Sequence, residues 1–137
     1  IYQQWRHERL VIDKCFSLQV TTCSANKAVA VARDLLKHPD FNLKNPNRFR
    51  ALIGALAMTP AAFHQADGSA YNLVADQLIA LDDINPQLCA RMTTVFETWR
   101  RYDGARQALM RAALSRLAAK PNLSRDTKEM VTRLLDA

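Results

Sequence analysis

The stretch Asn45-Pro46-Asn47-Arg48-Phe49-Arg50 decides the fold, because it marks a helix start that recurs forty residues later as Asn85-Pro86-Gln87. An asparagine side chain can accept hydrogen bonds from the free backbone N–H groups of a first helical turn. A proline that follows it lacks an N–H that would have had no partner. The spacing is close to that of helical-pair repeats, which are ~40–47 residues long. The two starts therefore predict an all-helical repeat protein.

Two arginines of this stretch stand at unusual positions. Arg48 falls in the first turn and Arg50 in the second, near the positive end of the helix dipole, where a cation is mildly disfavoured. A surface helix more often carries an acidic residue there. We therefore expect these arginines to be placed for a partner and not for the helix itself.

Apolar residues follow a helical period along nearly the whole chain, and no segment predicts a strand. Ser24 is expected to cap the second helix. Breaks fall at Thr21–Ser24, His38–Asp40, Pro60, Asp67–Ser69, Asp103–Gly104 and Pro121–Ser124. The expected apolar stripes are Trp5, Val11, Ile12, Cys15, Phe16 and Leu18; Ala28, Val31, Ala32 and Leu35; Phe49, Leu52, Ile53 and Leu56; Tyr71, Val74, Leu78 and Leu81; Leu88, Met92, Val95, Phe96 and Trp99; Met110, Ala113, Leu114 and Leu117; and Val131, Leu134 and Leu135.

These stripes predict about seven helices with short connections. The expected fold is all-α, a single helical domain over residues 1–137. Its helices stack as antiparallel pairs in a solenoid-like superhelix of the armadillo or HEAT type, in preference to a four-helix bundle. The chain begins at Ile1 without an initiator Met, so we expect it to be a piece of a longer protein.

Composition excludes several classes of protein. Apolar residues make up 49% of the 137 residues and charged residues 23%, which is an ordinary globular balance and not that of a disordered chain. No apolar run approaches the ~20 residues that cross a membrane. The three cysteines are odd in number and lack metal-ligand spacing. Reduced thiols and a cytoplasmic location are therefore expected.

Motifs for chemistry are missing from the sequence. It contains no His-Glu-x-x-His, no glycine-rich phosphate loop and no Cys-x-x-Cys. His7, His38 and His64 are far apart in sequence and are expected at the surface or at helix ends. The carboxylates of Asp82 and Asp83 are expected in a solvated loop. The chain by itself is therefore not expected to be an enzyme, and no catalytic or metal-binding residue is assigned to it.

The net charge of +6 raises the alternative of a nucleic-acid-binding module. The densest basic segment that includes aromatic residues is Trp99–Arg106. A solvated helix end is the expected explanation of this segment. Nucleic-acid binding would instead show as a steep loss of affinity with salt.

Several blocks of the chain resemble the C-terminal domain of bacterial aminopeptidase N, a zinc metallopeptidase of the gluzincin class. The resemblance runs in one register from about Trp5 to the end, with Cys15 where the family often has Trp and Ala70 where Gly is common. The blocks that carry it are Trp5, Leu10-Val11, Asp13-Lys14, Phe16 and Leu18-Gln19; Asn45–Ala55; Pro60–His64, Asp67-Gly68-Ser69 and Tyr71; Asn85-Pro86-Gln87; and Arg101-Tyr102-Asp103, Arg106-Gln107 and Met110.

The resemblance implies a parent enzyme that removes N-terminal residues from peptides. Its zinc would be bound outside this chain, by a His-Glu-x-x-His motif and a more distant Glu, with no cofactor in this domain. The helical domain would pack on the catalytic domain of the same polypeptide, enclose the active-site cavity and limit the entry of substrates. The parent is expected to be monomeric and cytoplasmic, with peptides as substrates and with neither nucleic acid nor membrane as partners.

By the same resemblance, Arg50, Gln87 and Arg91 would face the cavity and bind the substrate. Gln87 and Arg91 are four residues apart and share one helix face. Guanidinium groups could form forked hydrogen bonds with peptide carboxylate or carbonyl oxygens. Alternatively, these side chains pair with acidic neighbours or cap other helices, and such a structural pairing is expected for Arg48. An independent helical-repeat scaffold that binds a protein partner also stays open as a function.

Overall fold

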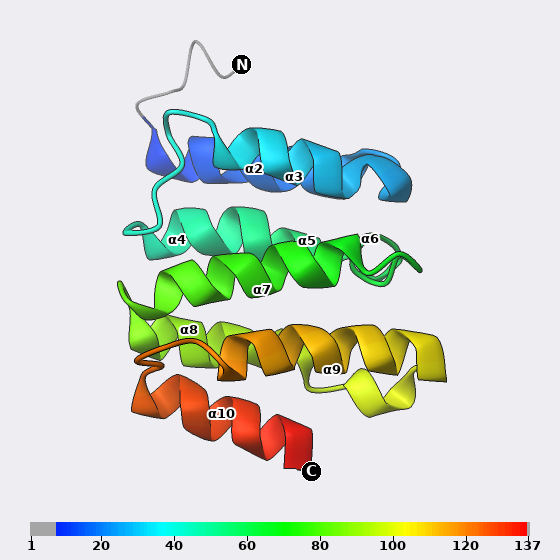
Figure 1. The fold of residues 1–137 in the computed structure, drawn as a ribbon. Coiled ribbons are helices and arrows are strands. Elements are labelled where there is room, and N and C mark those ends of the chain that lie inside the picture. The colour runs from blue at the N-terminus through cyan, green and yellow to red at the C-terminus, as the bar shows by residue number, and fades with distance from the viewer. Residues whose placement is uncertain (1–7, 137) are drawn as a thin grey trace. The chain divides into compact units, whose positions relative to one another are not determined.

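The computed structural model describes residues 8–136, and within this range its regular structure is helical, with no strand (Figure 1). The chain divides into two compact units, Ile1–Phe63 and His64–Ala137, each with its own core. The expectations for Trp5 and His7 fall outside the described residues.

The first unit is a set of helices that run in alternating directions along the chain (Figure 1). A single 3-10 turn precedes α3, and a π-helical turn joins α4 to α5, so that the chain is helical without interruption from residue 46 to residue 57. The elements are α2 (Arg9–Thr22), the 3-10 turn Ala25–Lys27, α3 (Ala28–Leu36), α4 (Pro46–Phe49), the π-helical turn Arg50–Gly54, α5 (Ala55–Ala57) and α6 (Pro60–Phe63).

The core of the first unit contains most of the expected apolar stripes, with two corrections. The buried apolar residues are Ile12, Phe16, Val20, Ala28, Ala32, Leu35, Phe49, Leu52, Ile53, Leu56, Ala62 and Phe63. Leu18 is 44% exposed, because it follows Phe16 by two residues and so points to the opposite side of α2. Ser24 makes no side-chain capping bond, so the expected cap is wrong.

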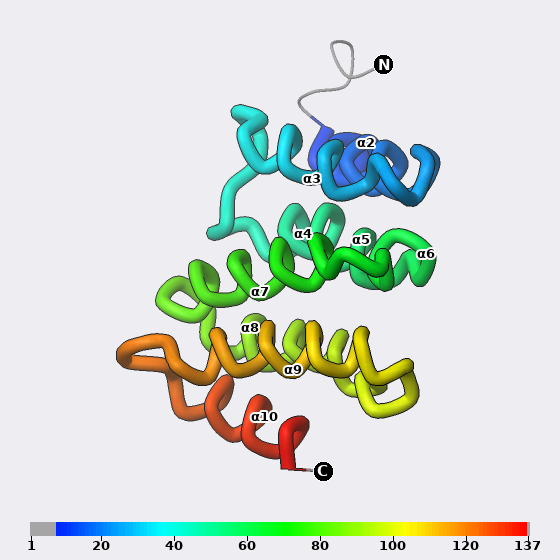
Figure 2. Tube along the Cα trace, turned by 45° about the vertical axis from the view of Figure 1, so that its right-hand side comes forward, coloured from blue at the N-terminus to red at the C-terminus, as the bar shows by residue number. Residues whose placement is uncertain are grey.

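Within the second unit, successive helices also run in alternating directions along the chain (Figure 1). In both views α9 lies between α7 and α10, and α7 and α10 each pack against both α8 and α9 (Figure 2). The elements are α7 (Ser69–Asp82), α8 (Pro86–Thr93), the 3-10 turns Thr94–Phe96 and Trp99–Arg101, α9 (Gly104–Ala118) and α10 (Arg125–Asp136).

The helix that starts at Asn85 ends earlier than the apolar stripe predicts. It stops at Thr93, and two 3-10 turns carry the chain on to Trp99. The indole N–H of Trp99 donates to the backbone carbonyl of Leu134, 3.0 Å away, at the end of α10. This buried tryptophan therefore joins the turn to α10, and a buried indole N–H needs such an acceptor.

Asp82 is buried, so the expectation of a solvated loop is wrong for this residue. Only 2% of Asp82 is exposed, and its carboxylate receives hydrogen bonds from the N–H of Ser124 at 2.8 Å, the hydroxyl of Ser124 at 2.6 Å and the hydroxyl of Thr127 at 2.7 Å. These bonds link the end of α7 to the start of α10. The neighbouring Asp83 is exposed and pairs with Lys120 at 2.7 Å.

The predicted fold class is confirmed. Residues 8–136 form an all-helical protein of stacked helices, with seven longer helical segments and the single turns of α6 and Trp99–Arg101. Cys15, Cys23 and Cys89 are unpaired. Within the described range, no helix combines the length and the apolar character needed to cross a bilayer.

Candidate functional site

Both predicted helix starts are capped by their asparagines. The side-chain oxygen of Asn45 accepts from the backbone N–H of Arg48 at 3.0 Å, and that of Asn85 accepts from the N–H of Leu88 at 3.0 Å. Proline occupies the first helical position in each case. The capped starts fix the direction of the helices that carry the predicted site residues.

Arg48 has a structural role, as expected. It is 4% exposed, donates from Nε to the carboxylate of Asp13 on α2, and donates from Nη1 to the backbone carbonyl of Asp40. Its guanidinium lies 5.3 Å from the ring centroid of Phe16. The cation at the positive end of the helix dipole is thus compensated by a carboxylate on another helix.

Arg50 is the first residue of the π-helical turn, and its side chain is exposed. The guanidinium donates to the side-chain oxygen of Asn47 at 3.3 Å and forms no ion pair with a described residue. Within the same turn, the backbone carbonyl of Ala51 accepts from the hydroxyl of Ser17 on α2 at 2.7 Å. The backbone that carries Arg50 is therefore held to α2 while its side chain stays in solvent.

Gln87 and Arg91 lie one turn apart on the exposed side of α8. Neither side chain makes a hydrogen bond or an ion pair with another residue in the range 8–136. The opposite side of the helix is buried through Leu88, Cys89, Ala90 and Thr93. The acidic pairing considered as an alternative is therefore not found for Arg50 or Arg91 among the described residues. Arg50 belongs to the first unit, and Gln87 and Arg91 belong to the second.

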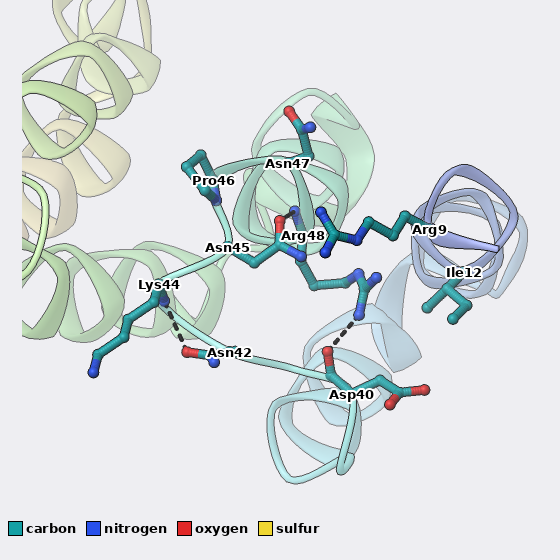
Figure 3. Close-up of a pocket in the computed structure, with 9 residues that line it drawn as sticks. All are labelled: Arg9, Ile12, Asp40, Asn42, Lys44, Asn45, Pro46, Asn47 and Arg48. Carbon is teal, nitrogen blue, oxygen red and sulfur yellow. Dashed lines mark hydrogen bonds between the residues drawn. The ribbon is translucent and has the colours of Figure 1, made fainter. Parts of the chain in front are cut away.

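A pocket of about 570 Å³ at the capped start of α4 was not predicted (Figure 3). It lies within the first unit and is formed by α2, the loop before α4 and the first turn of α4. The lining residues are Arg9, Ile12, Asp40, Asn42, Lys44, Asn45, Pro46, Asn47 and Arg48. The Asn-Pro-Asn-Arg motif was the sequence signal at this place, but the contribution of Arg9 depends on tertiary structure.

A ring cluster in the second unit was also missed. The ring of His64 stacks on that of Tyr102, with centroids 3.9 Å apart, and its Nδ1 lies 2.5 Å from the hydroxyl oxygen of Tyr71. Burial and the charge of Arg106 lower the pKa of His64, and burial raises the pKa of Tyr71 to about 12. Arg106 also donates from Nε to the His64 carbonyl at 2.8 Å. The tyrosine hydroxyl therefore stays protonated at neutral pH and can donate to the neutral imidazole.

Most cations of the basic segment Trp99–Arg106 are used within the second unit. Arg100 lies over the ring of Trp99, with 4.4 Å from its guanidinium carbon to the ring centroid, and donates to the carbonyl of Leu135 at 2.7 Å. Arg106 pairs with Asp103 at 2.9 Å. These contacts explain the segment as part of the fold.

No set of three or more His, Cys, Asp or Glu side chains is arranged to hold a metal ion in the part of the chain that the structure describes. The donor chemistry of these residues therefore does not fit a resident zinc ion, which would need such ligands in a tetrahedral arrangement.

The stacked helices and their capped starts define a helical-repeat protein of the armadillo class. Residues 1–136 match the family described as "Domain of unknown function (DUF3458_C) ARM repeats". The chain belongs to this family.

Named relatives support the resemblance to aminopeptidase N that the motifs indicated. The chain is 42% identical over 134 residues to aminopeptidase N of Haemophilus influenzae, covering 97% of this chain and 15% of the relative. It is 44% identical over 133 residues to aminopeptidase N of Escherichia coli, covering 96% and 15%. It is 39% identical over 135 residues to that of Caulobacter vibrioides, covering 98% and 16%.

A solved structure has the same fold. It is that of Legionella pneumophila aminopeptidase A in complex with aspartic acid, with a TM-score of 0.92 and 36% identity. The match covers 98% of this chain and 16% of that one. The chain thus corresponds to about one sixth of the length of these aminopeptidases.

Proposed function

We propose that this chain is the C-terminal domain of a zinc-dependent aminopeptidase that releases N-terminal amino acids from peptides. The observation that carries the proposal is the identity of 39–44% to aminopeptidases N along nearly the whole chain. By the resemblance to these enzymes, the metal would be bound by a His-Glu-x-x-His motif and a distant Glu in another part of the polypeptide. When bound, zinc would activate the water that attacks the peptide bond.

In this proposal the helical domain packs on the catalytic domain of the same polypeptide, encloses the active-site cavity and limits entry to peptides and unfolded chain ends. The parent acts as a monomer in the cytoplasm, on peptides and not on nucleic acid or membranes. The domain contributes shape and substrate contacts rather than catalytic groups. Its rigid, capped helices suit that role, because a cavity wall must hold its side chains in fixed positions.

Arg50, Gln87 and Arg91 are the proposed substrate contacts. Two arginines without a carboxylate partner among the described residues keep their forked donors available for a peptide carboxylate or carbonyl. Arg50 also starts a π-helical turn, and such turns occur frequently at functional sites. Gln87 adds a neutral donor and acceptor one turn before Arg91 on the same helix face.

The test compares two substrate lengths in the full-length parent enzyme. Substituting Arg50→Ala or Arg91→Ala is expected to raise KM about tenfold for longer peptides, as the loss of one charged hydrogen bond would. KM for single-residue amides should change far less, and Gln87→Ala should show a smaller effect of the same kind. Arg33→Ala in the first unit and Arg101→Ala in the second are matched controls, because both side chains are exposed. Equal changes for both substrates would exclude a contact with the distal part of the peptide.

A second experiment locates the catalysis. The full-length protein is expected to contain zinc and to hydrolyse alanyl amides, whereas residues 1–137 alone are expected to do neither. Atomic absorption measures the zinc content of each protein, and release of the amine measures the hydrolysis of alanyl amides. Activity in the isolated chain would overturn the proposal.

A further inference from the structure

The pocket at the start of α4 is lined by hydrogen-bond donors (Figure 3). Three asparagines line it, and each has its side-chain oxygen occupied by an N–H group from a residue two or three positions later. The bonds are Lys44 N to Asn42 at 2.9 Å, Arg48 N to Asn45 at 3.0 Å and Arg50 Nη1 to Asn47 at 3.3 Å. None of the three amide NH₂ groups donates to a described residue, so these donors are available, together with the second lone pair of each oxygen.

Two arginines add charge to these donors. Figure 3 shows Arg9 extending from α2 toward Arg48, and Arg9 makes no hydrogen bond or ion pair with a described residue. Arg48 uses Nε and Nη1 within the fold, whereas Nη2 has no bond to a described residue. No buried side-chain nitrogen in the described range lacks a partner, so Nη2 of Arg48, a residue that is 4% exposed, keeps some contact with solvent.

The lining of the pocket contains fewer acidic than basic side chains. Among the described residues that line the pocket, Asp40 alone is acidic, against Arg9, Lys44 and Arg48. Its backbone carbonyl accepts from Arg48, and Figure 3 shows its carboxylate directed away from the three asparagines. With Arg48 paired to Asp13, the lining still carries a positive formal charge, because Arg9 and Lys44 outnumber Asp40. Arg9 and Lys44 have no acidic partner among the described residues, so their charges are available to attract an anion.

We propose that this pocket binds a small molecule through an oxyanion group, a phosphate or a carboxylate. Guanidinium and amide donors are the groups that recognise such oxygens, and charge-assisted bonds of this kind are the strong ones. The volume of about 570 Å³ lies within the range of small-molecule sites, ~300–1,000 Å³, so there is room for more than the anion alone. The proposal does not rest on the peptidase function, because none of the proposed substrate contacts Arg50, Gln87 and Arg91 lines the pocket and no zinc is needed.

Hydrogen exchange followed by mass spectrometry tests the site in the full-length protein. Inorganic phosphate or succinate is added in steps, and sodium chloride of the same ionic strength serves as the reference. We expect saturable protection of the backbone amides in the peptide that spans Asp40–Arg48. Protection by phosphate but not by succinate would indicate a phosphate ligand. Protection by succinate but not by phosphate would indicate a carboxylate ligand.

Two substitutions make the test specific. Arg9→Gln removes an exposed charge, and we expect the half-saturating concentration to rise at least about fivefold, as the loss of a charge-assisted bond implies. Asn42→Asp keeps an oxygen for the N–H of Lys44 but replaces the NH₂ donor by a carboxylate, so protection should disappear. Arg33→Gln, an exposed arginine on α3, should behave as the wild type.

Three results would overturn the proposal. They are the absence of protection with both anions, equal protection by chloride, and protection that persists unchanged in Arg9→Gln and Asn42→Asp. Peptidase activity is not measured in this experiment, so its failure is distinguishable from a failure of the proposed function.

Discussion

The guanidinium of Arg48 donates from Nε to the carboxylate of Asp13, 35 residues earlier in the chain. The arginine side chain is 5% exposed and the aspartate side chain 15%. The pair joins the first turn of α4 to α2 and sits beside the ring of Phe16. It therefore fixes one of the two helix starts on which the fold depends, in an environment where water screens the charges little.

We predict that Arg48→Ala lowers the free energy of unfolding by ~3 kcal/mol, because it leaves a largely buried carboxylate without its cation. Asp13→Ala should cost a similar amount, and the double variant should cost much less than the sum of the two. Urea unfolding followed by circular dichroism measures these values. The exposed pair Arg125–Glu129 is the control, since its removal should cost only ~0.3–0.5 kcal/mol. Additive losses at Arg48 and Asp13 would show that the two do not stabilise each other.

The sequence predicted those parts of the fold that depend on local chemistry. The two Asn-Pro starts, the break at Asp103–Gly104 and the buried stripe of α7 follow from turn and capping chemistry and from the 3.6-residue period, which act within a few residues. The period also placed Phe16 and Ile12 in the core. The prediction for Leu18 is wrong because two residues along a helix turn the side chain by about 200°, away from the side on which Phe16 lies.

The parts that were missed depend on contacts between distant segments. The sequence around Asp82 predicts a carboxylate in a solvated loop. Its hydrogen-bond donors come from Ser124 and Thr127, more than forty residues later in the chain. The pocket at α4 depends on Arg9, which no local motif connects with Asn45. No local pattern in the sequence indicates that two such distant segments lie in contact. Arg50 and Arg91 were named from family resemblance, and their role stays a prediction.

Removal of the asparagine caps should weaken each helix start separately. Asn45→Ala and Asn85→Ala are each expected to lower the free energy of unfolding by ~1 kcal/mol, since one N–H of the first turn loses its acceptor. The serine variants at the same positions retain an oxygen and should lose only a fraction of this. Chemical denaturation of the four variants measures the difference. Equal losses for Ala and Ser would mean that the side-chain oxygen is not what stabilises the turn.

The buried carboxylate of Asp82 should matter more than its exposed neighbour. Asp82→Asn puts an NH₂ group among the donors of Ser124 and Thr127, and we expect a loss of ~2 kcal/mol in the free energy of unfolding. Asp83→Asn breaks the contact of an exposed carboxylate with Lys120 and should cost less than ~1 kcal/mol. Thermal and urea unfolding at neutral pH compare the two. Similar losses at both positions would contradict the capping role of Asp82.

The stabilising effect of Asp82 should depend on pH. Burial on its own would raise the pKa of Asp82, but the hydrogen bonds from Ser124 and Thr127 outweigh burial and lower it. A carboxyl group with a lowered pKa in the folded state stabilises fully above its unfolded pKa, about 3.9, and this stabilisation is lost as the pH falls through the folded pKa. The gap in stability between wild type and Asp82→Asn should therefore narrow below about pH 4. A gap that stays constant down to about pH 2 would show that the charge contributes nothing.

His64 should give the second unit a pH dependence of the same sign in a higher range. Burial and Arg106 lower its pKa below 6.5, so between the folded pKa and 6.5 the unfolded chain holds more protons than the folded one. Stability then rises with pH through this window and is complete above it. The variant His64→Gln should lack this rise in unfolding experiments between about pH 5 and pH 7.

The stacked ring of Tyr102 supplies part of the burial that lowers the pKa of His64, because the two centroids are 3.9 Å apart. Tyr102→Ala should therefore let the pKa of His64 return toward 6.5 and flatten the pH dependence, whereas Tyr102→Phe keeps the ring and should preserve the slope. Tyr71→Phe removes the hydroxyl that bonds to Nδ1 and should lower stability by ~1 kcal/mol. If Tyr102→Ala and Tyr102→Phe kept the same slope, the stacked ring would not be what disfavours the charged imidazole, and burial by the other neighbours together with the charge of Arg106 would be the cause.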